Sequence, residues 1–120
     1  MTMNDTDKPP LDWIEEFPGA VTVCDLDGVV LAMNARAGQT FAKWGGAALV
    51  GKSLLDCHPG PARAKLLGLL ASGGSNAYTI EKQGVRKLIY QAPWFRAGRR
   101  QGLVELSLEI PSQLPHYVRS

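Results

Sequence analysis

The last strand-like segment of the chain constrains the fold most, because its apolar and polar side chains alternate. Residues 103–110 place apolar Val104, Leu106, Leu108 and Ile110 between polar Glu105, Ser107 and Glu109. A period of two is typical of a β-strand in a sheet with one solvated face. Two further β-type segments, residues 77–83 and 86–95, precede it. Pro93 predicts a bulge or an edge position in the middle segment, because proline donates no hydrogen bond to a ladder. The last third is therefore predicted to be three consecutive strands, separated by Gln83-Gly84 and by residues 96–102.

The first third predicts a hairpin. Residues 20–25 and 29–33 are β-type segments that flank Asp27-Gly28. Asp-Gly between two such segments predicts a type I′ turn, in which both central residues need a positive φ.

Helical patterns occupy the middle of the chain. Asn34 predicts the N-cap of a helix over residues 35–44, since its side chain can accept a first-turn N–H. Residues 47–59 predict short helical turns joined by loops. A longer helix is predicted within residues 60–74, which begin with Gly-Pro and end with Gly-Gly. Its expected buried stripe comprises Ala62, Leu66, Leu69 and Leu70.

Composition indicates one soluble globular domain. The 120 residues are 45% hydrophobic and 20% charged, with a formal net charge of +2, which is ordinary for such a domain. We expect a disordered leader at residues 1–10, the domain at 11–111 and a tail at 112–120. The sequence predicts no signal peptide and no membrane span. Cys24 and Cys57 are too few for a disulfide framework, so we expect a reducing, cytoplasmic location.

Three arginines, Arg96, Arg99 and Arg100, cluster near Trp94 and Phe95 in a predicted hairpin tip. Such a cluster can bind nucleic acid. The small net charge and the lack of a recognition motif favour a solvated loop instead. We therefore expect neither a nucleic-acid partner nor a membrane partner.

Residues 46–53 match the phosphate-loop pattern G-x-x-x-x-G-K-[ST] letter for letter. A true phosphate loop joins a buried strand to the start of a long helix, where free backbone N–H groups hold the anion. Upstream, Phe41 and Trp44 have helical spacing, and downstream Pro59 limits any helix that begins at Lys52. The flanks therefore argue against a phosphate loop, and nucleotide binding by this segment is kept as an alternative function.

The order of the predicted elements resembles a PAS domain: two strands, a cluster of short helices, one longer helix and three strands. Residues 25–28 followed by Asn34 are similar to the opening PAS hairpin and the asparagine that begins its first helix. Residues 46–53 resemble the PAS stretch that ends in Gly-Lys-Ser. Residues 56–59, Asp-Cys-His-Pro, resemble a PAS subgroup with Cys-His-Pro at this point, and residues 90–105 resemble the closing hairpin.

This resemblance implies an α+β fold, with a five-stranded antiparallel sheet and helices packed on one face. It implies a sensory or protein-interaction module that is not an enzyme and that signals in trans to a partner protein. Known ligands of the family include haem, flavin and small metabolites. A haem-binding sensor with His58 as axial ligand is therefore a further alternative.

The adjacent residues Cys57 and His58 carry the side chains best suited to ligand binding or reaction in the chain. Imidazole is a common metal ligand, and a thiolate can bind haem iron. Adjacent residues point to different sides of a helix or strand, and no Asp or second His completes a triad or a zinc site. We therefore predict no catalytic residue and no metal site. Three interpretations stay open: structural roles for both, a ligand contact at His58, and redox chemistry at Cys57.

Side chains expected between the sheet and the helices are candidates for a ligand pocket. The alternative is a filled core, because a pocket and a core use the same residue types. The pocket candidates are Phe41, Trp44, Leu54, Leu55, His58, Leu66, Leu70 and Tyr90.

Before the first strand, residues 11–17 predict a short amphipathic helix that ends at Pro18-Gly19. Two helical turns cannot bury these apolar side chains on themselves, so they must dock on the sheet or on a second copy. In PAS-like proteins a leading helix often supplies the dimer contact. We expect a homodimer through this helix and the exposed face of the sheet, with interface residues Leu11, Trp13, Ile14 and Phe17.

Overall fold

The computed structural model describes residues 11–120, and the predicted disordered leader lies outside the described part. Short 3₁₀ helices carry the label η. The chain begins with η1 (Leu11–Ile14), β1 (Ala20–Asp25) and β2 (Val30–Met33). The helical region comprises α1 (Ala35–Thr40), η2 (Ala42–Trp44), η3 (Gly46–Leu49), η4 (Leu54–Cys57) and α2 (Pro61–Ser72). The last elements are β3 (Asn76–Lys82), β4 (Val85–Arg96) and β5 (Arg99–Ile110).

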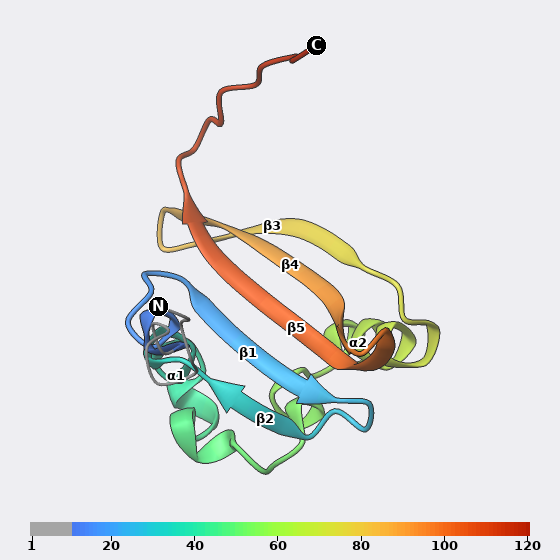
Figure 1. The fold of residues 1–120 in the computed structure, drawn as a ribbon. Coiled ribbons are helices and arrows are strands. Elements are labelled where there is room, and N and C mark those ends of the chain that lie inside the picture. Colours follow the sequence, from blue (N-terminus) through green and yellow to red (C-terminus); the bar gives the residue numbers. More distant parts are fainter. Residues whose placement is uncertain (1–10) are drawn as a thin grey trace, which may run out of the picture.

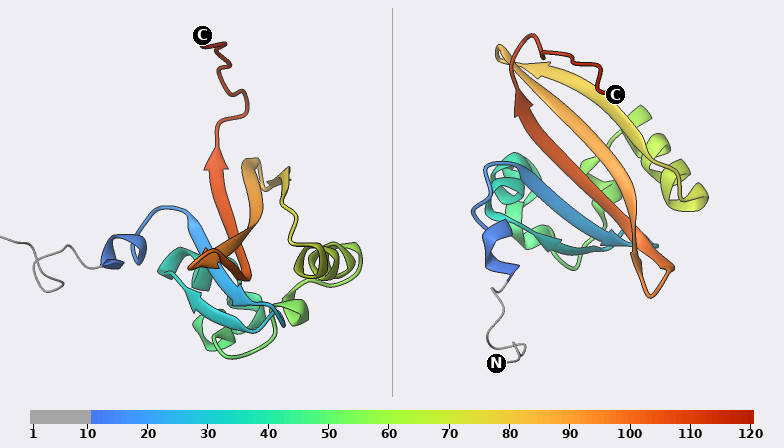
Figure 2. Two further views of the ribbon diagram at one scale, coloured as in Figure 1. Left: turned by 45° about the vertical axis from the view of Figure 1, so that its right-hand side comes forward. Right: turned by 45° about the horizontal axis from the view of Figure 1, so that its top comes forward.

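These five strands form one twisted antiparallel sheet in the order β2-β1-β5-β4-β3 (Figure 1). The central strand β5 pairs with β1 on one side and with β4 on the other. Helices α1 and α2 lie on the same side of the sheet (Figure 2). The expected α+β fold, with helices on one face, is confirmed. No helix among residues 11–120 combines the length and apolar character that crossing a bilayer demands.

Two of the hairpin turns have positive φ at both central residues, as type I′ turns require. Gln83 and Gly84 have φ of 53° and 78°, and Ala97 and Gly98 have φ of 51° and 76°. The second turn lets β4 and β5 pair as far as Arg96 and Arg99. The predicted loop over residues 96–102 is therefore wrong, because most of it is strand.

The β1–β2 turn differs from the predicted type I′ turn, because positive φ occurs at Gly28 (83°) but not at Asp27. The Asp25 side chain organises this turn instead. Its Oδ1 accepts hydrogen bonds of 2.9 Å from the backbone N–H groups of Asp27 and Val29. A local side-chain acceptor thus stabilises a longer loop than the two-residue turn that the sequence predicts.

The predicted single helix over residues 35–44 is also wrong. α1 ends at Thr40, and Phe41 (φ −101°, ψ 21°) separates it from the 3₁₀ helix η2. Gly38 and Thr40 are both weak helix formers, so α1 has little intrinsic tendency to continue. The expected irregularity near Pro93 is present, because the register between β4 and β5 shifts between Trp94 and Phe95.

One buried side chain, Asn34, joins three segments. Its Oδ1 accepts from the backbone N–H of Val21 in β1 (2.9 Å) and of Ala37 in α1 (3.0 Å); the second bond is the predicted N-cap. Its Nδ2 donates to the carbonyl oxygens of Ile14 (2.9 Å) and Gly19 (2.8 Å). Two donors and two acceptor sites are the full capacity of an amide. This single side chain therefore fixes the leading segment, β1 and α1 relative to one another.

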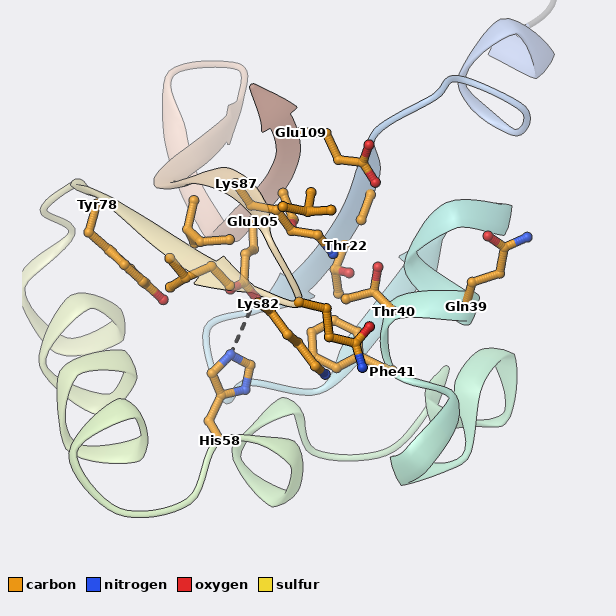
Figure 3. Close-up of a pocket in the computed structure, with 16 residues that line it drawn as sticks. Thr22, Gln39, Thr40, Phe41, His58, Tyr78, Lys82, Lys87, Glu105 and Glu109 are labelled. Carbon is orange, nitrogen blue, oxygen red and sulfur yellow. Dashed lines mark ion pairs between the residues drawn. The ribbon is translucent and has the colours of Figure 1, made fainter. Parts of the chain in front are cut away.

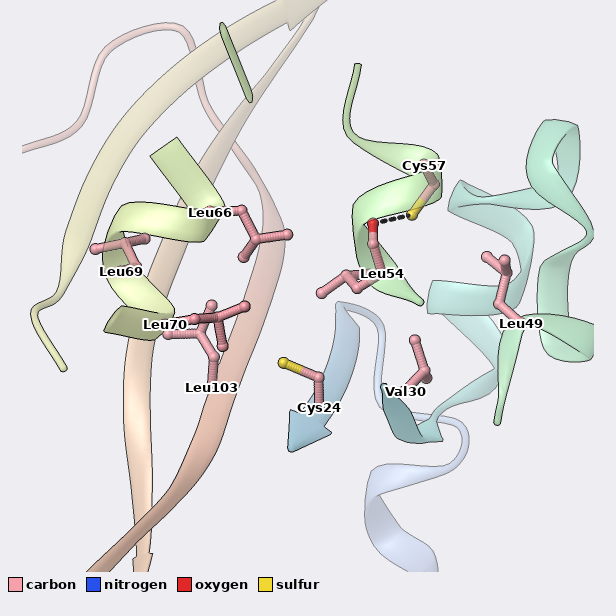
Figure 4. Packing of buried hydrophobic residues seen from close by; sticks show 9 residues of the cluster. All are labelled: Cys24, Val30, Leu49, Leu54, Cys57, Leu66, Leu69, Leu70 and Leu103. Atoms are coloured by element: carbon pink, nitrogen blue, oxygen red, sulfur yellow. Dashed lines mark hydrogen bonds between the residues drawn. The ribbon is translucent and has the colours of Figure 1, made fainter. Parts of the chain in front are cut away.

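The buried core lies between α2, the sheet and the short helices (Figure 4). Three leucines of the predicted α2 stripe, Leu66, Leu69 and Leu70, are buried there. Ala62 is exposed, so the stripe begins one turn later than predicted. The whole cluster comprises Cys24, Val30, Leu49, Leu54, Cys57, Leu66, Leu69, Leu70 and Leu103.

The polar side chains of β5 face the helices, and its apolar side chains face the open side of the sheet. A sheet with a solvated polar face would have the opposite arrangement. Glu105, Ser107 and Glu109 point toward the helices and line a cavity there. The alternate residues Leu106 and Leu108 lie on the face without α1 and α2, and they are only partly buried. The alternation predicts the strand correctly, but it does not specify which face the helices cover.

Replacing Asn34 by alanine should lower the free energy of unfolding by about 3 kcal/mol, because two buried N–H groups and two carbonyls lose their partner. The matched control is Asn76→Ala. The amide of Asn76 makes one side-chain hydrogen bond, to Gln91 (3.1 Å), at a partly buried position, so a loss of about 1 kcal/mol is expected. Urea denaturation of both variants measures the difference; equal losses would contradict the role assigned to Asn34.

Candidate functional site

A cavity of about 430 Å³ lies between the helix-facing side of the sheet, α1 and the loop that carries His58 (Figure 3). Its apolar wall includes Phe41 and Ile89, and its polar wall includes Thr22, His58 and Glu105. Small-molecule sites typically have volumes of roughly 300–1,000 Å³. The cavity therefore has a suitable size for a small ligand.

His58 directly follows η4 and faces β5 from the opposite side of the cavity. Its Nδ1 is 2.9 Å from the carbonyl oxygen of Leu54. Its Nε2 is 3.4 Å from Oε2 of Glu105, and these two side chains are only 8% and 9% exposed. Because a carbonyl oxygen can only accept, Nδ1 carries a hydrogen. Both ring nitrogens thus face oxygen acceptors, an arrangement that favours the imidazolium form.

The pKa of His58 is raised from 6.5 to about 10 by the balance of two opposing effects. Burial, the largest single effect, disfavours the charged ring and lowers the pKa. The contacts with Cys57 and Glu105, the negative charge of Glu105 and the Leu54 carbonyl together outweigh it. His58 and Glu105 therefore form a buried ion pair at neutral pH.

A row of polar side chains continues from Glu105 across the sheet. Gln91 of β4 donates from Nε2 to Oε1 of Glu105 (3.3 Å), and Asn76 of β3 donates from Nδ2 to Oε1 of Gln91 (3.1 Å). The other carboxylate oxygen, Oε2 of Glu105, is buried and has no hydrogen-bond partner within residues 11–120. It faces His58 at 3.4 Å, without the geometry of a hydrogen bond. Within the described residues, the partner of this oxygen is thus the His58 ring, through the ion pair.

The two cysteines lie in the packed core and not in the cavity. Cys57 Sγ donates to the carbonyl oxygen of Leu54 (3.1 Å) and lies 3.5 Å from Nδ1 of His58. Burial raises the pKa of the Cys24 thiol to about 11. Thiols buried among apolar side chains are chemically inert, so the geometry favours structural roles for Cys24 and Cys57.

The predicted pocket candidates separate into three groups. Phe41 and His58 line the cavity, and their rings lie 5.9 Å apart. Trp44 and Tyr90 are exposed by 41% and 43%, and Tyr90 lies on the opposite face of the sheet from Ile89. The remaining four pack in or against the core cluster: Leu54, Leu55, Leu66 and Leu70.

Sequence reasoning missed most of the polar lining of the cavity. Thr22 in β1 and Glu105 in β5 are direct neighbours across the sheet and are both buried. The only sequence signal for Glu105 was its place in the alternating segment, and this signal does not distinguish a solvated face from a polar cavity. Lys87 and Tyr78 also line the cavity. Burial, followed by the negative charge of Glu105, raises the pKa of Tyr78.

The geometry does not favour His58 as an axial ligand of haem. An axial histidine presents an unprotonated ring nitrogen to the metal, whereas both nitrogens of His58 face acceptors and its pKa is about 10. Neither Cys24 nor Cys57 lines the cavity. Residues 11–120 also contain no group of three or more His, Cys, Asp or Glu side chains that could hold a metal ion.

The segment that matches a phosphate loop is not built like one. It follows the 3₁₀ helix η2 and leads into η4, which has only four residues. Its backbone N–H groups are already used: Gly51 donates to Val30 (2.8 Å) and Lys52 to Leu49 (2.8 Å). Gly46 donates to Phe41 (2.9 Å). A phosphate would therefore find few free donors here.

Two of the three clustered arginines have contacts within the protein. Arg96 lies over the Trp94 ring, with its guanidinium carbon 5.4 Å from the ring centroid. Arg100 donates to the carbonyl oxygen of Leu70 in the last turns of α2 (2.7 Å). The second contact satisfies a helix C-terminal carbonyl with a cation, so it ties the β4–β5 hairpin to α2.

The leading segment lies over the edge of the sheet face that α1 and α2 leave open. Ile14 lines a shallow depression together with Val21 and Val23 of β1. Trp13 is 61% exposed and Phe17 is 39% exposed. Of the four predicted dimer residues, Leu11 has no described side chain. The other three thus add apolar surface next to the open face of the sheet.

Because the folded-state pKa of His58 is raised, protonation of its ring stabilises the fold. This contribution is complete below pH 6.5 and is lost as the pH rises through about 10. The unfolding free energies of the wild-type protein and of His58→Gln should therefore converge as the pH increases over this range, as measured by urea denaturation. His116→Gln is the control, because His116 is exposed near the C-terminus. A constant difference between wild type and His58→Gln would contradict the protonated pair.

Several solved structures share this fold. The VqmA dimer of Vibrio cholerae in the absence of target DNA has a TM-score of 0.63 at 16% identity, over 94% of this chain and 58% of VqmA. VqmA bound to DPO has a TM-score of 0.61 at 16% identity, over 83% and 56%. The Aer2 receptor of Vibrio cholerae, a dual PAS-heme oxygen sensor, has a TM-score of 0.55 at 14% identity, over 78% and 95%. At these identities the likeness shows the fold alone, and the chain spans little more than half the length of VqmA.

A comparison with curated proteins found no match. A family model described as "PAS fold" matches residues 14–113, which include every element from β1 to β5. The match thus covers most of the chain and agrees with the sheet order and with the structural neighbours. This chain belongs to the PAS family.

Proposed function

We propose that this PAS domain is a non-enzymatic sensory or interaction module that forms a homodimer and binds a small molecule in the cavity. It signals in trans, through a change in the surface that a partner protein contacts. The two faces of β5 carry this proposal. Glu105 and Ser107 line the cavity on one face, whereas Leu106 and Leu108 form part of an open apolar surface on the other.

The open apolar surface supports the dimer. Leu106 lies near its centre, because it pairs with Val21 of β1 on one side and with Tyr90 of β4 on the other. At one end the surface continues into the leading segment, since the Phe17 ring and the Leu108 side chain both lie next to Gly19. Monomeric proteins rarely leave large contiguous apolar patches exposed. A second copy of the same surface would cover it with twofold symmetry.

The cavity supports the ligand-binding role. It has a polar wall that includes the buried side chains of Thr22, His58 and Glu105, and an apolar wall that includes Phe41. His58 is protonated and already paired with Glu105, so it is unsuited to act as a general base. This supports a binding function over a catalytic one. VqmA bound to DPO is an example of a protein with the same fold that holds a ligand.

The two roles can be coupled through the central strand. A ligand that contacts the polar side chains of β5 favours one position of that strand, and the same strand supplies the dimer surface. By this route a ligand shifts the population between two dimer arrangements. We place the module in the cytoplasm, because its two cysteines are free thiols, which suits a reducing compartment.

Substituting Leu106 by glutamate should convert the dimer to a monomer, because two like charges would face each other in an apolar interface. Light scattering after gel filtration, at protein concentrations of tens of micromolar, measures the mass. The control is Leu67→Glu on α2, since Leu67 is also an exposed leucine (47%) but lies away from the open sheet face. A monomeric wild-type protein, or a dimer that persists in Leu106→Glu, would reject the proposed interface.

A further inference from the structure

Two groups of opposite charge lie near opposite ends of the open sheet face. The leading segment, residues 11–17, carries three carboxylates, at Asp12, Glu15 and Glu16, and no cation. The tip of the β4–β5 hairpin, residues 94–101, carries three arginines and no carboxylate. In the part of the chain that the structure describes, neither group contributes to an ion pair. Both groups can therefore interact with a partner.

The hairpin tip presents part of its positive charge on the open face. Leu103 of β5 faces the core, so its neighbour Gly102 and the cross-strand partner of Gly102, Trp94, face the open side. Arg96 lies over the Trp94 ring, with its guanidinium carbon 5.4 Å from the centroid. Arg99 is the cross-strand partner of Arg96, and both arginines are exposed. An aromatic ring with two cations thus forms one end of this face.

The leading segment lies at the other end of the face (Figure 1). Glu15 lines the shallow depression beside Val21, and Leu108 of β5 is close to the same segment. Leu108 and Arg99 are nine residues apart in β5, which is about 30 Å along a strand. The Asn34 amide holds the segment in place through two backbone carbonyls. Since salt screens charges over roughly 10 Å, the two groups cannot attract each other within one copy.

These charges distinguish two ways of joining two copies through their open faces. If both sheets run in the same direction, leading segment meets leading segment, and tip meets tip, so like charges face each other. If one copy is turned end for end, each leading segment lies at the partner's tip end, and twofold symmetry forms this contact twice. At that end the arginines attract the carboxylates, whereas the β1–β2 turn, which carries Asp25 and Asp27, repels them.

We propose that the two copies of the homodimer are turned end for end, with the acidic leading segment of each copy against Trp94, Arg96 and Arg99 of the other. This inference rests on the proposed homodimer and adds its orientation and its charged contacts. Trp13, which is 61% exposed, brings an aromatic ring to the same contact, where a guanidinium can lie over it. The dimer then has an apolar centre at Leu106 and a charged contact at each end, as protein interfaces commonly have a polar rim.

Charge reversal at either group tests this orientation. Arg96→Glu/Arg99→Glu and Glu15→Lys/Glu16→Lys should each weaken the dimer about tenfold, because like charges then meet at both contacts. Sedimentation equilibrium of the full chain at about 50 mM salt measures each dissociation constant. Raising the salt to about 500 mM should weaken the wild-type dimer and strengthen the dimers of the variants, since salt screens attraction in the first and repulsion in the others.

An equal mixture of the two variants should restore the dimer. In a mixed dimer, the introduced carboxylates at the tip of one chain face the introduced ammonium groups in the leading segment of the other. The second contact keeps the natural charges. The mixed dimer should therefore form with about wild-type affinity, which also shows that both variants are folded. Native mass spectrometry distinguishes it from the two homodimers by mass.

Lys43→Glu/Lys65→Glu is the matched control, because it makes the same change in net charge on the helix side of the sheet. Both lysines are exposed, on η2 and α2. Lys43 lies over the Trp44 ring at 5.3 Å, much as Arg96 lies over Trp94. The dissociation constant of this variant should equal that of the wild-type protein.

The outcomes separate the orientation from the dimer itself. If the wild-type protein dimerises and the charge-reversed variants dimerise equally well, the orientation is overturned while the proposed homodimer stands. The same holds if the control weakens the dimer as much as the tip variant does. If the wild-type protein is monomeric at tens of micromolar, both the inference and the proposed homodimer are overturned.

Discussion

The fold depends on the four hydrogen bonds of the Asn34 side chain. This one amide bonds to β1, to α1 and to the leading segment, so it fixes the elements that close one end of the cavity. Gln39 and Thr40, which line the cavity, follow within the same short helix. A six-residue helix has little stability of its own, and its position is therefore set mainly by this cap. The geometry of the cavity thus depends on a residue that does not line it.

The buried pair of His58 and Glu105 gives the site its second constraint. A buried ion pair gains little net stability, because desolvation offsets much of its Coulomb attraction. Its effect here is to hold a carboxylate on the helix-facing side of a central strand, where an apolar residue would have filled the space. Val30, Leu54 and Leu103 show what the same fold does elsewhere, since they pack into a closed core. The cavity and the core both lie on the helix-facing side of the sheet, but the cavity is lined partly by polar side chains and the core by apolar ones.

Much of the architecture could be predicted from the sequence, because periodicity and turn residues act locally. The strands, the Asn34 cap and the buried leucines of α2 all follow from patterns within a few residues. The faces of β5 could not be predicted, because the alternation of Leu106 with Glu105 is compatible with helices on either side. Phe41 and His58 were among the pocket candidates together with Leu54 and Leu66, which the structure places in the core. Only the tertiary packing separates these two groups, since both contain residues suited to an interior. The turn at Asp25 differed from prediction because one carboxylate competed with the Asp-Gly preference.

The contact between Arg100 and the end of α2 has a mechanical consequence. α2 begins at Pro61, three residues after His58, and its last turns are bonded to the β4–β5 hairpin through the Leu70 carbonyl. Twelve helical residues span about 18 Å, and an α-helix resists compression along its axis. The helix therefore connects the segment that carries His58 to the tip of the β4–β5 hairpin. The β4–β5 turn at Ala97-Gly98 is thus linked to the segment that carries His58 by one helix and one hydrogen bond, although neither turn residue lines the cavity.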